Sequence, residues 1–188
     1  MDINDYTPES LLLLLQERDE QARIEAKRAS EIGKSVMQTI CAFANEPGLG
    51  GGYLLLGIEE PNHEYEDFHV VGVDDADCLL NDIQINCRGQ FEAPIPVQGD
   101  VVILEGKKVI RVFVPELEAA AKPCAFSGKF DSKNKRKTGV WRRGLNGDYE
   151  CAHQHELEPL LLAKRGMSFE QVVLPDADLK VFLDANEA

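Results

Sequence analysis

The spacing of apolar residues along the chain predicts helices and strands in an interleaved order. Over residues 30–45, Ile32, Val36, Ile40 and Phe43 recur at three- and four-residue intervals, which predicts an amphipathic helix. Similar spacing predicts further helices, and short apolar or alternating runs predict strands. These helices cover residues 8–18, 75–91 and 154–165, and the strands cover residues 22–29, 52–60, 69–73, 100–104, 108–114 and 139–143.

This order of elements predicts an α+β fold, with a mixed, mostly antiparallel sheet of about five strands and helices packed on it. A chain of 188 residues with 44% hydrophobic and 28% charged residues has the size and composition of one globular domain. We expect this domain to span residues 1–165. Residues 166–188 combine turn residues, acids and two apolar clusters, and we expect a linker or C-terminal extension there.

The composition also predicts the compartment. No apolar run approaches the roughly 18 residues that a membrane-spanning helix needs. The first residues, MDINDYTPES, are acidic and polar, unlike a signal peptide. The five cysteines are an odd number without a CxxC pair, which favours free thiols in a reducing environment. We therefore expect a cytoplasmic protein with no membrane partner.

The glycine-rich stretch Gly48–Gly57, GLGGGYLLLG, raises the question of a phosphate-binding loop. Such loops follow a strand and precede a helix, so that the amides at the helix N-terminus face the phosphate. Here the predicted order is helix, glycines and then strand, and neither GK[ST] nor GxGxxG occurs. The glycines are therefore interpreted as a helix stop and a tight turn with positive φ.

The net charge of −13 argues against nucleic-acid binding by the surface as a whole, but the cations are unevenly distributed. Residues 129–143 carry seven of the 20 Lys and Arg residues and only one of the 33 acids. Such a segment is either a solvated loop or a local phosphate-binding patch, in which Trp141 would stack on a base. The candidate nucleic-acid contacts are Lys27, Lys129, Lys133, Lys135, Arg136, Lys137, Trp141, Arg142 and Arg143.

Four carboxylates form a second candidate site. Glu20 and Glu25 flank the start of one predicted strand, and Glu59 and Glu60 end another. If the two strands are neighbours, the acids converge and offer the hard oxygen ligands that Mg²⁺ or Mn²⁺ needs for phosphodiester cleavage. The alternative is that they are ordinary solvated acids at strand ends. Lys27 lies on the same strand face as Glu25 and either pairs with it or contacts phosphate.

Several motifs occur in an order that resembles the Schlafen AlbA_2 family of DNA-binding domains, found in bacterial transcriptional regulators and Schlafen proteins. Glu20, Glu25 and Lys27 match its E-x4-E-F-K pattern, although Ala26 replaces the usual aromatic residue. The most specific part is ICAFAN, the glycine turn and GYLLLGIEE, over residues 40–60. VIRVFVPE followed by KP, and then GVWRRGLN, complete a match over about residues 9–163, with GLN in place of the commoner GSS.

The resemblance implies a mixed α/β domain that binds DNA or RNA, as the N-terminal part of a transcriptional regulator whose further domain would follow Ala188. In the Schlafen branch it also implies a metal-dependent endoribonuclease, in which Glu20, Glu25 and Glu59 or Glu60 would hold the metal. A third reading is a ligand-sensing or dimerisation module that never meets nucleic acid, and a homodimer is compatible with each reading.

Overall fold

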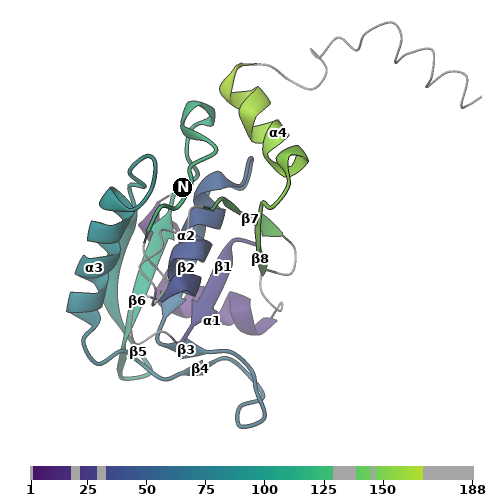
Figure 1. The fold of residues 1–188 in the computed structure, drawn as a ribbon. Coiled ribbons are helices and arrows are strands. Elements are labelled where there is room, and N and C mark those ends of the chain that lie inside the picture. The colour runs from purple at the N-terminus through teal and green to yellow at the C-terminus, as the bar shows by residue number, and fades with distance from the viewer. Residues whose placement is uncertain (1, 18–21, 29–32, 129–138, 145–146, 167–188) are drawn as a thin grey trace, which may run out of the picture.

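The computed structural model describes residues 2–17, 22–28, 33–128, 139–144 and 147–166. A central mixed sheet has the strand order β1-β2-β6-β5 (Figure 1). β1 (Ile24–Lys27) runs parallel to β2 (Gly52–Leu56), whereas β6 (Lys107–Val114) is antiparallel to both β2 and β5 (Gln98–Leu104). The predicted α+β class and the mixed sheet are confirmed.

Two small two-stranded sheets flank the central one. β3 (Ile58–Glu59) pairs with β4 (His69–Val70), and β7 (Trp141–Gly144) pairs with β8 (Gly147–Glu150). The predicted strands over residues 52–60, 69–73 and 139–143 cover β3, β4 and β7, but the sequence pattern does not reveal β8. The strands are therefore divided among three sheets, and the central one has four members.

The four predicted helices are present. They are α1 (Pro8–Glu17), α2 (Lys34–Asn45), α3 (Ala76–Gly89) and α4 (Gln154–Lys164). Two short 3-10 helices, η1 (Ile3–Asp5) and η2 (Ala119–Ala121), complete the described elements. The expected linker or extension falls on residues 167–188, outside the described residues, and stays a prediction.

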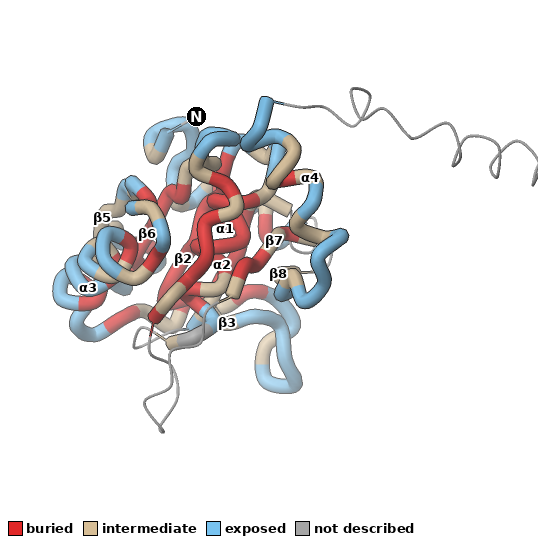
Figure 2. The backbone as a smooth tube through the Cα atoms, turned by 45° about the horizontal axis from the view of Figure 1, so that its top comes forward, coloured by how far each residue is buried: buried red, intermediate tan, exposed pale blue. Residues whose placement is uncertain are grey.

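Alternation along the strands builds a core on each face of the central sheet. Leu54 and Leu56 of β2 pack with α2 and α3 in one cluster, while Tyr53 and Leu55 pack with α1 in the other. β2 is therefore buried along its whole length, and Figure 2 shows it in red together with much of α2. Burial on both faces explains why the sequence of β2 is continuously apolar instead of alternating.

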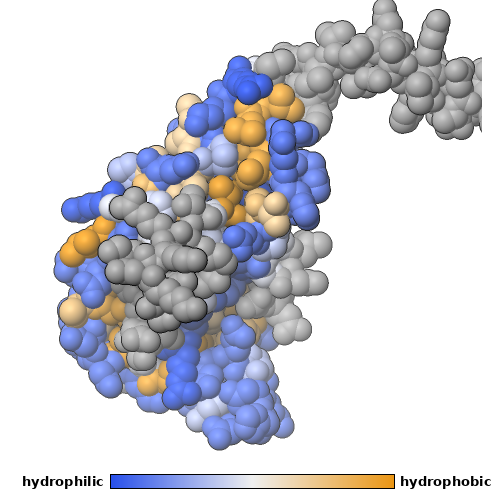
Figure 3. Space-filling model, viewed as in Figure 1, coloured by the Kyte–Doolittle hydropathy of each residue, from blue (hydrophilic) through white to orange (hydrophobic). Residues whose placement is uncertain are grey.

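The β7–β8 sheet packs against α2 and lies beside β1, because Arg143 of β7 donates to the Ala22 and Ile24 carbonyls. α4 lies further out and contributes Leu160 to a small cluster with Ala125 and Val140. Figure 3 shows an apolar strip over α4 on an otherwise largely hydrophilic face. None of the described helices is both long and apolar enough to span a membrane.

Candidate functional site

The predicted site residue Glu25 lies in a buried ion-pair network between β1 and β7. Its side chain is on the α2 face of the sheet and the residue is only 5% exposed. Oε1 accepts a hydrogen bond from Lys27 Nζ at 2.6 Å, so the predicted pairing of these two residues is confirmed. Oε2 lies 2.8 Å from Arg143 Nη1 but receives no well-aligned hydrogen bond, so this second contact is charge pairing.

Arg143 is the centre of this network. Its Nη1 also donates to Asp148 Oδ1 at 2.9 Å, and its Nε donates to the Ala22 carbonyl at 3.0 Å. The guanidinium lies over the Phe43 ring, 5.2 Å from its centroid. Burial acts to lower the pKa of Arg143, but Glu25 and Asp148 outweigh it and raise the pKa above its usual value. Arg143 is therefore a charged residue that joins β1, α2 and β8 inside the protein.

Arg142 has a similar role on the other side of β7. Its Nε and Nη2 donate to the two carboxylate oxygens of Glu46 at 3.0 and 2.8 Å. The hydrogen bonds to Glu46 raise the pKa of Arg142 more than burial lowers it. The Arg143 amide adds a third bond to Glu46, so this carboxylate clamps β7 to the C-terminal end of α2.

These positions correct three of the predicted nucleic-acid contacts. Trp141 is 3% exposed and belongs to the core cluster on the α2 face, so it offers no surface for a base to stack on. The Arg143 side chain is 1% exposed, and both arginines are already paired with acids. The sequence suggested phosphate binding because it showed three adjacent candidate residues. It could not show that Trp141 and Arg143 point inward from β7, or that the acidic partners of the two arginines come from other elements.

The predicted carboxylate cluster does not assemble among the described residues. Glu59 pairs with Arg28 at 3.3 Å, Glu60 is exposed, and Glu25 faces two cations. No group of three or more His, Cys, Asp or Glu residues in the described ranges is placed to hold a metal ion. Glu20 lies outside the described residues, so a role for it in a Mg²⁺ or Mn²⁺ site stays a prediction.

The segment that holds the basic residues Lys129, Lys133, Lys135, Arg136 and Lys137 also lies outside the described residues. The structure does describe the residues on either side of this segment. Phe126 and Gly139 form a β-bridge in which each amide donates to the other's carbonyl, at 2.8 and 3.0 Å. Phe126 is buried and stacks edge-on against Phe91. The segment thus leaves and re-enters the fold at one point, which is fixed to the core beside the C-terminal end of α3.

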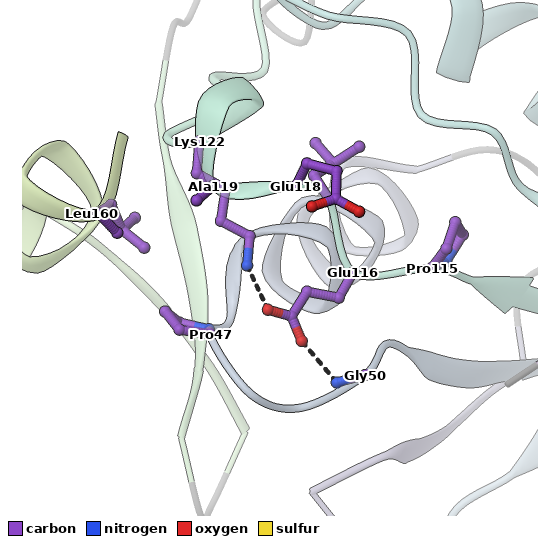
Figure 4. Close-up of a pocket in the computed structure, with 10 residues that line it drawn as sticks. Pro47, Gly50, Pro115, Glu116, Glu118, Ala119, Lys122 and Leu160 are labelled. Atoms are coloured by element: carbon purple, nitrogen blue, oxygen red, sulfur yellow. Dashed lines mark hydrogen bonds and ion pairs between the residues drawn. The ribbon is translucent and has the colours of Figure 1, made fainter. Parts of the chain in front are cut away.

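The glycine loop binds an anion from within the chain. The Gly50 amide donates to Glu116 Oε2 at 2.6 Å and Lys122 Nζ donates to Oε1 at 2.5 Å (Figure 4). The Gly48 amide also donates to Oε1, at 3.0 Å. Burial raises the pKa of Glu116, but the bonds from Lys122 and from the two glycine amides outweigh it, and the pKa is lowered. The interpretation as a tight turn is therefore incomplete, since the loop also cradles a carboxylate.

A cavity of about 530 Å³ opens beside this cradle. It is bounded by the glycine loop, by residues 115–119 and by Leu160 and Ala163 of α4. Lys122 lines it although the residue is only 3% exposed. Sequence reasoning missed Glu46, Glu116, Lys122 and Asp148, because a sequence does not show which charged residues pair. The partner of Glu46, Arg142, is 96 residues away, and the nearer pairs Glu116–Lys122 and Arg143–Asp148 follow no recognisable motif.

Comparisons with known proteins agree with this architecture. A family model described as Schlafen, AlbA_2 matches residues 20–149. The solution structure of the N-terminal domain of a protein described as related to the ATP-dependent DNA helicase RecG, from Nitrosomonas europaea, is 36% identical to the chain, with a TM-score of 0.58. The alignment covers 82% of this chain and 96% of that domain.

The DIP2311 protein from Corynebacterium diphtheriae is 19% identical with a TM-score of 0.48, over 82% of this chain and 29% of that one. No curated protein sequence matches the chain significantly. Because the family model spans well over half of the sequence, the chain belongs to the Schlafen AlbA_2 family.

Proposed function

We propose that this domain binds nucleic acid, and specifically DNA, through the basic segment at residues 129–137. The observation that carries the proposal is the concentration of five of the chain's 20 Lys and Arg residues there, beside a single Asp, in a molecule of net charge −13. Phosphate contacts supply most of the affinity of non-specific nucleic-acid binding. A local cationic segment on an acidic body concentrates that affinity at one place.

The way this segment is attached supports the proposal. Its two ends meet at the Phe126–Gly139 bridge, and the strand that follows it is held by the arginine–carboxylate network. Arg142 and Arg143 therefore hold β7 in place, and the five cations of residues 129–137 remain the candidates for phosphate contact. DNA is preferred over RNA because the 36% identical domain belongs to a protein described as related to a DNA helicase. Participation in transcriptional regulation is the corresponding proposal for the cellular role.

A charge-matched pair of variants tests this proposal. In the first, Lys133, Lys135, Arg136 and Lys137 are replaced by Gln. In the control, the exposed cations Arg88, Lys108, Lys164 and Arg165 are replaced by Gln, which changes the net charge equally. Binding of a labelled DNA duplex, single-stranded DNA and an RNA hairpin is then measured over a range of salt concentrations.

The first variant should bind DNA at least about tenfold more weakly at low salt. Its salt slope, the slope of the logarithm of the binding constant against the logarithm of the salt concentration, should be smaller in magnitude by about 0.9 per lost phosphate contact. The control should retain the parent's salt slope. Equal weakening in both variants would show that only net charge matters and would refute the assignment to residues 129–137. Tighter binding of the RNA hairpin than of the duplex would refute the preference for DNA.

A further inference from the structure

β5 is an edge strand of the central sheet, and its outer edge has no partner in the described part of the chain. It hydrogen-bonds to β6 on one side only (Figure 1). Figure 2 shows β5 in tan and pale blue, in contrast to the buried β2. An edge of this kind presents free amides and carbonyls that can template another strand.

The hydrogen bonds of β6 identify which residues of β5 face outward. The Lys108 carbonyl accepts from the Val73 amide at 2.8 Å, so the backbone groups of Lys108 point away from β5. Val109 and Arg111 therefore point toward β5, where they pair with Val102 and Asp100. By the same alternation, Lys107 and Phe113 point their backbone groups toward Leu104 and Gln98. Three residues of β5 therefore direct their amides and carbonyls to the free edge. They are Gly99, Val101 and Ile103.

The side-chain positions of the same three residues lie on one face of the sheet. The large residue at one end of the three, Ile103, complements the small residue at the other end, Gly99. Ile103 is the most exposed large apolar residue in the described ranges, at 62%. Gly99 has no side chain, and a Cβ there would lie 2.5 Å from Leu80 Cδ1, so Leu80 covers the position. In an antiparallel pair of β5 strands related by a twofold axis at Val101, Ile103 of each copy lies over Gly99 and Leu80 of the other.

The charges of β5 are compatible with this arrangement. Asp100 is its only charged residue, and Arg111 holds both carboxylate oxygens at 3.0 and 2.6 Å. Two acidic molecules can therefore approach along this edge without opposing free carboxylates. β5 also has no proline, one of the devices by which edge strands block pairing.

We infer that two copies of this chain associate through their β5 strands, antiparallel and centred on Val101, to form one continuous eight-stranded sheet. This inference goes beyond the proposed function and does not depend on it. The contact is isologous, with backbone hydrogen bonds from the three outward-facing residues and the insertion of Ile103 over Gly99 on both sides of the axis.

The first experiment measures self-association of the full chain by sedimentation equilibrium, comparing Ile103→Lys with Ile85→Lys. Ile85 lies on α3 and is 57% exposed, so the two substitutions make similar changes at similarly exposed positions. Ile103→Lys should weaken dimerisation at least about tenfold, because burial of an isoleucine is lost at two symmetric positions. Ile85→Lys should leave it unchanged. A monomeric parent, or equal effects of the two variants, would overturn the inference.

The second experiment tests the register by disulfide formation in a Cys78→Ser background, since Cys78 is an exposed native thiol. Val101→Cys places two thiols at a strand pair about 5.5 Å apart between Cα atoms, within disulfide range. Ile103→Cys is the control, because the proposed register separates the two copies of residue 103 by about 13 Å. Oxidation should give a covalent dimer for Val101→Cys alone. A dimer that cross-links only through residue 103, or through neither residue, would overturn the proposed register.

Discussion

Glu25 Oε2 of β1 and Arg143 Nη1 of β7 lie 2.8 Å apart, with both side chains buried. The two residues are far apart in the sequence, so their contact joins the first strand of the central sheet to the β7–β8 sheet. Lys27 on one side and Asp148 on the other extend the pair into a chain of alternating charges. These acids and bases, which the sequence presented as catalytic and phosphate-binding candidates, balance one another inside the protein.

Glu25→Gln should destabilise the fold strongly. It leaves Lys27 with no described carboxylate partner and leaves Asp148 as the one described carboxylate that pairs with Arg143. Breaking a buried ion pair from one side typically costs about 3–5 kcal/mol. Urea denaturation should report this loss. The control Glu60→Gln changes an exposed acid and should stay within about 0.5 kcal/mol of the parent. Equal stabilities of the two variants would contradict the structural role of Glu25.

Metal addition separates this structural role from the predicted metal-ligand role of Glu25. Both of its oxygens face cations, so Mg²⁺ or Mn²⁺ should not raise the melting temperature of the parent protein. A metal-dependent rise that is lost in Glu25→Gln, together with cleavage of a labelled RNA hairpin, would instead support the metal site with Glu20.

Arg142→Gln should reduce stability without changing the electrostatics of nucleic-acid binding. The substitution removes two charge-assisted hydrogen bonds to Glu46, for a cost of about 1.5–3 kcal/mol by thermal or urea unfolding. Because Arg142 is occupied by Glu46, the salt slope for DNA binding should match that of the exposed control Arg165→Gln. A slope that falls by about one unit in Arg142→Gln alone would show that Arg142 contacts a phosphate after all.

The sequence predicted the helices and most strands well, because their periodicities reflect which face each element buries. The stripe Ile32, Val36, Ile40 and Phe43 led to α2, and the apolar run within residues 52–60 led to β2. It predicted the site less well, because charge in a sequence does not reveal pairing. Arg143 and Glu25 looked like two separate functional groups until the fold brought them together.

Glu116 should make the stability of the fold depend on pH in the acid range. Its pKa is lowered in the folded protein, below a value of about 4.5 for the free side chain. The unfolded chain therefore binds this proton first as the pH falls, so the stabilisation is fully present above pH 4.5 and declines toward the lower folded pKa.

Melting temperatures measured from pH 6 to pH 3 should fall less steeply for Glu116→Gln than for the parent. Glu118→Gln, at an exposed position next to the same cavity, should retain the parent's slope. If Glu118→Gln flattened the curve as much, the cradle would not be the source of the dependence.

Two glycines of the loop should differ sharply in their tolerance of alanine, although both have positive φ. Gly48, at φ 75°, has open space where a Cβ would project, so Gly48→Ala should cost only the left-handed backbone strain of about 1–2 kcal/mol. Gly51, at φ 92°, would place a Cβ 2.2 Å from the Val114 carbonyl oxygen, so Gly51→Ala must also push β2 away from the end of β6. We expect it to cost at least about 3 kcal/mol, or to prevent folding.

Circular dichroism melts of the two variants make the comparison, and Gly48→Ala serves as the control for adding a side chain to the loop. Similar melting temperatures would mean that the contact of the loop with β6 is not tight, and the position of the Glu116 cradle would then need revision.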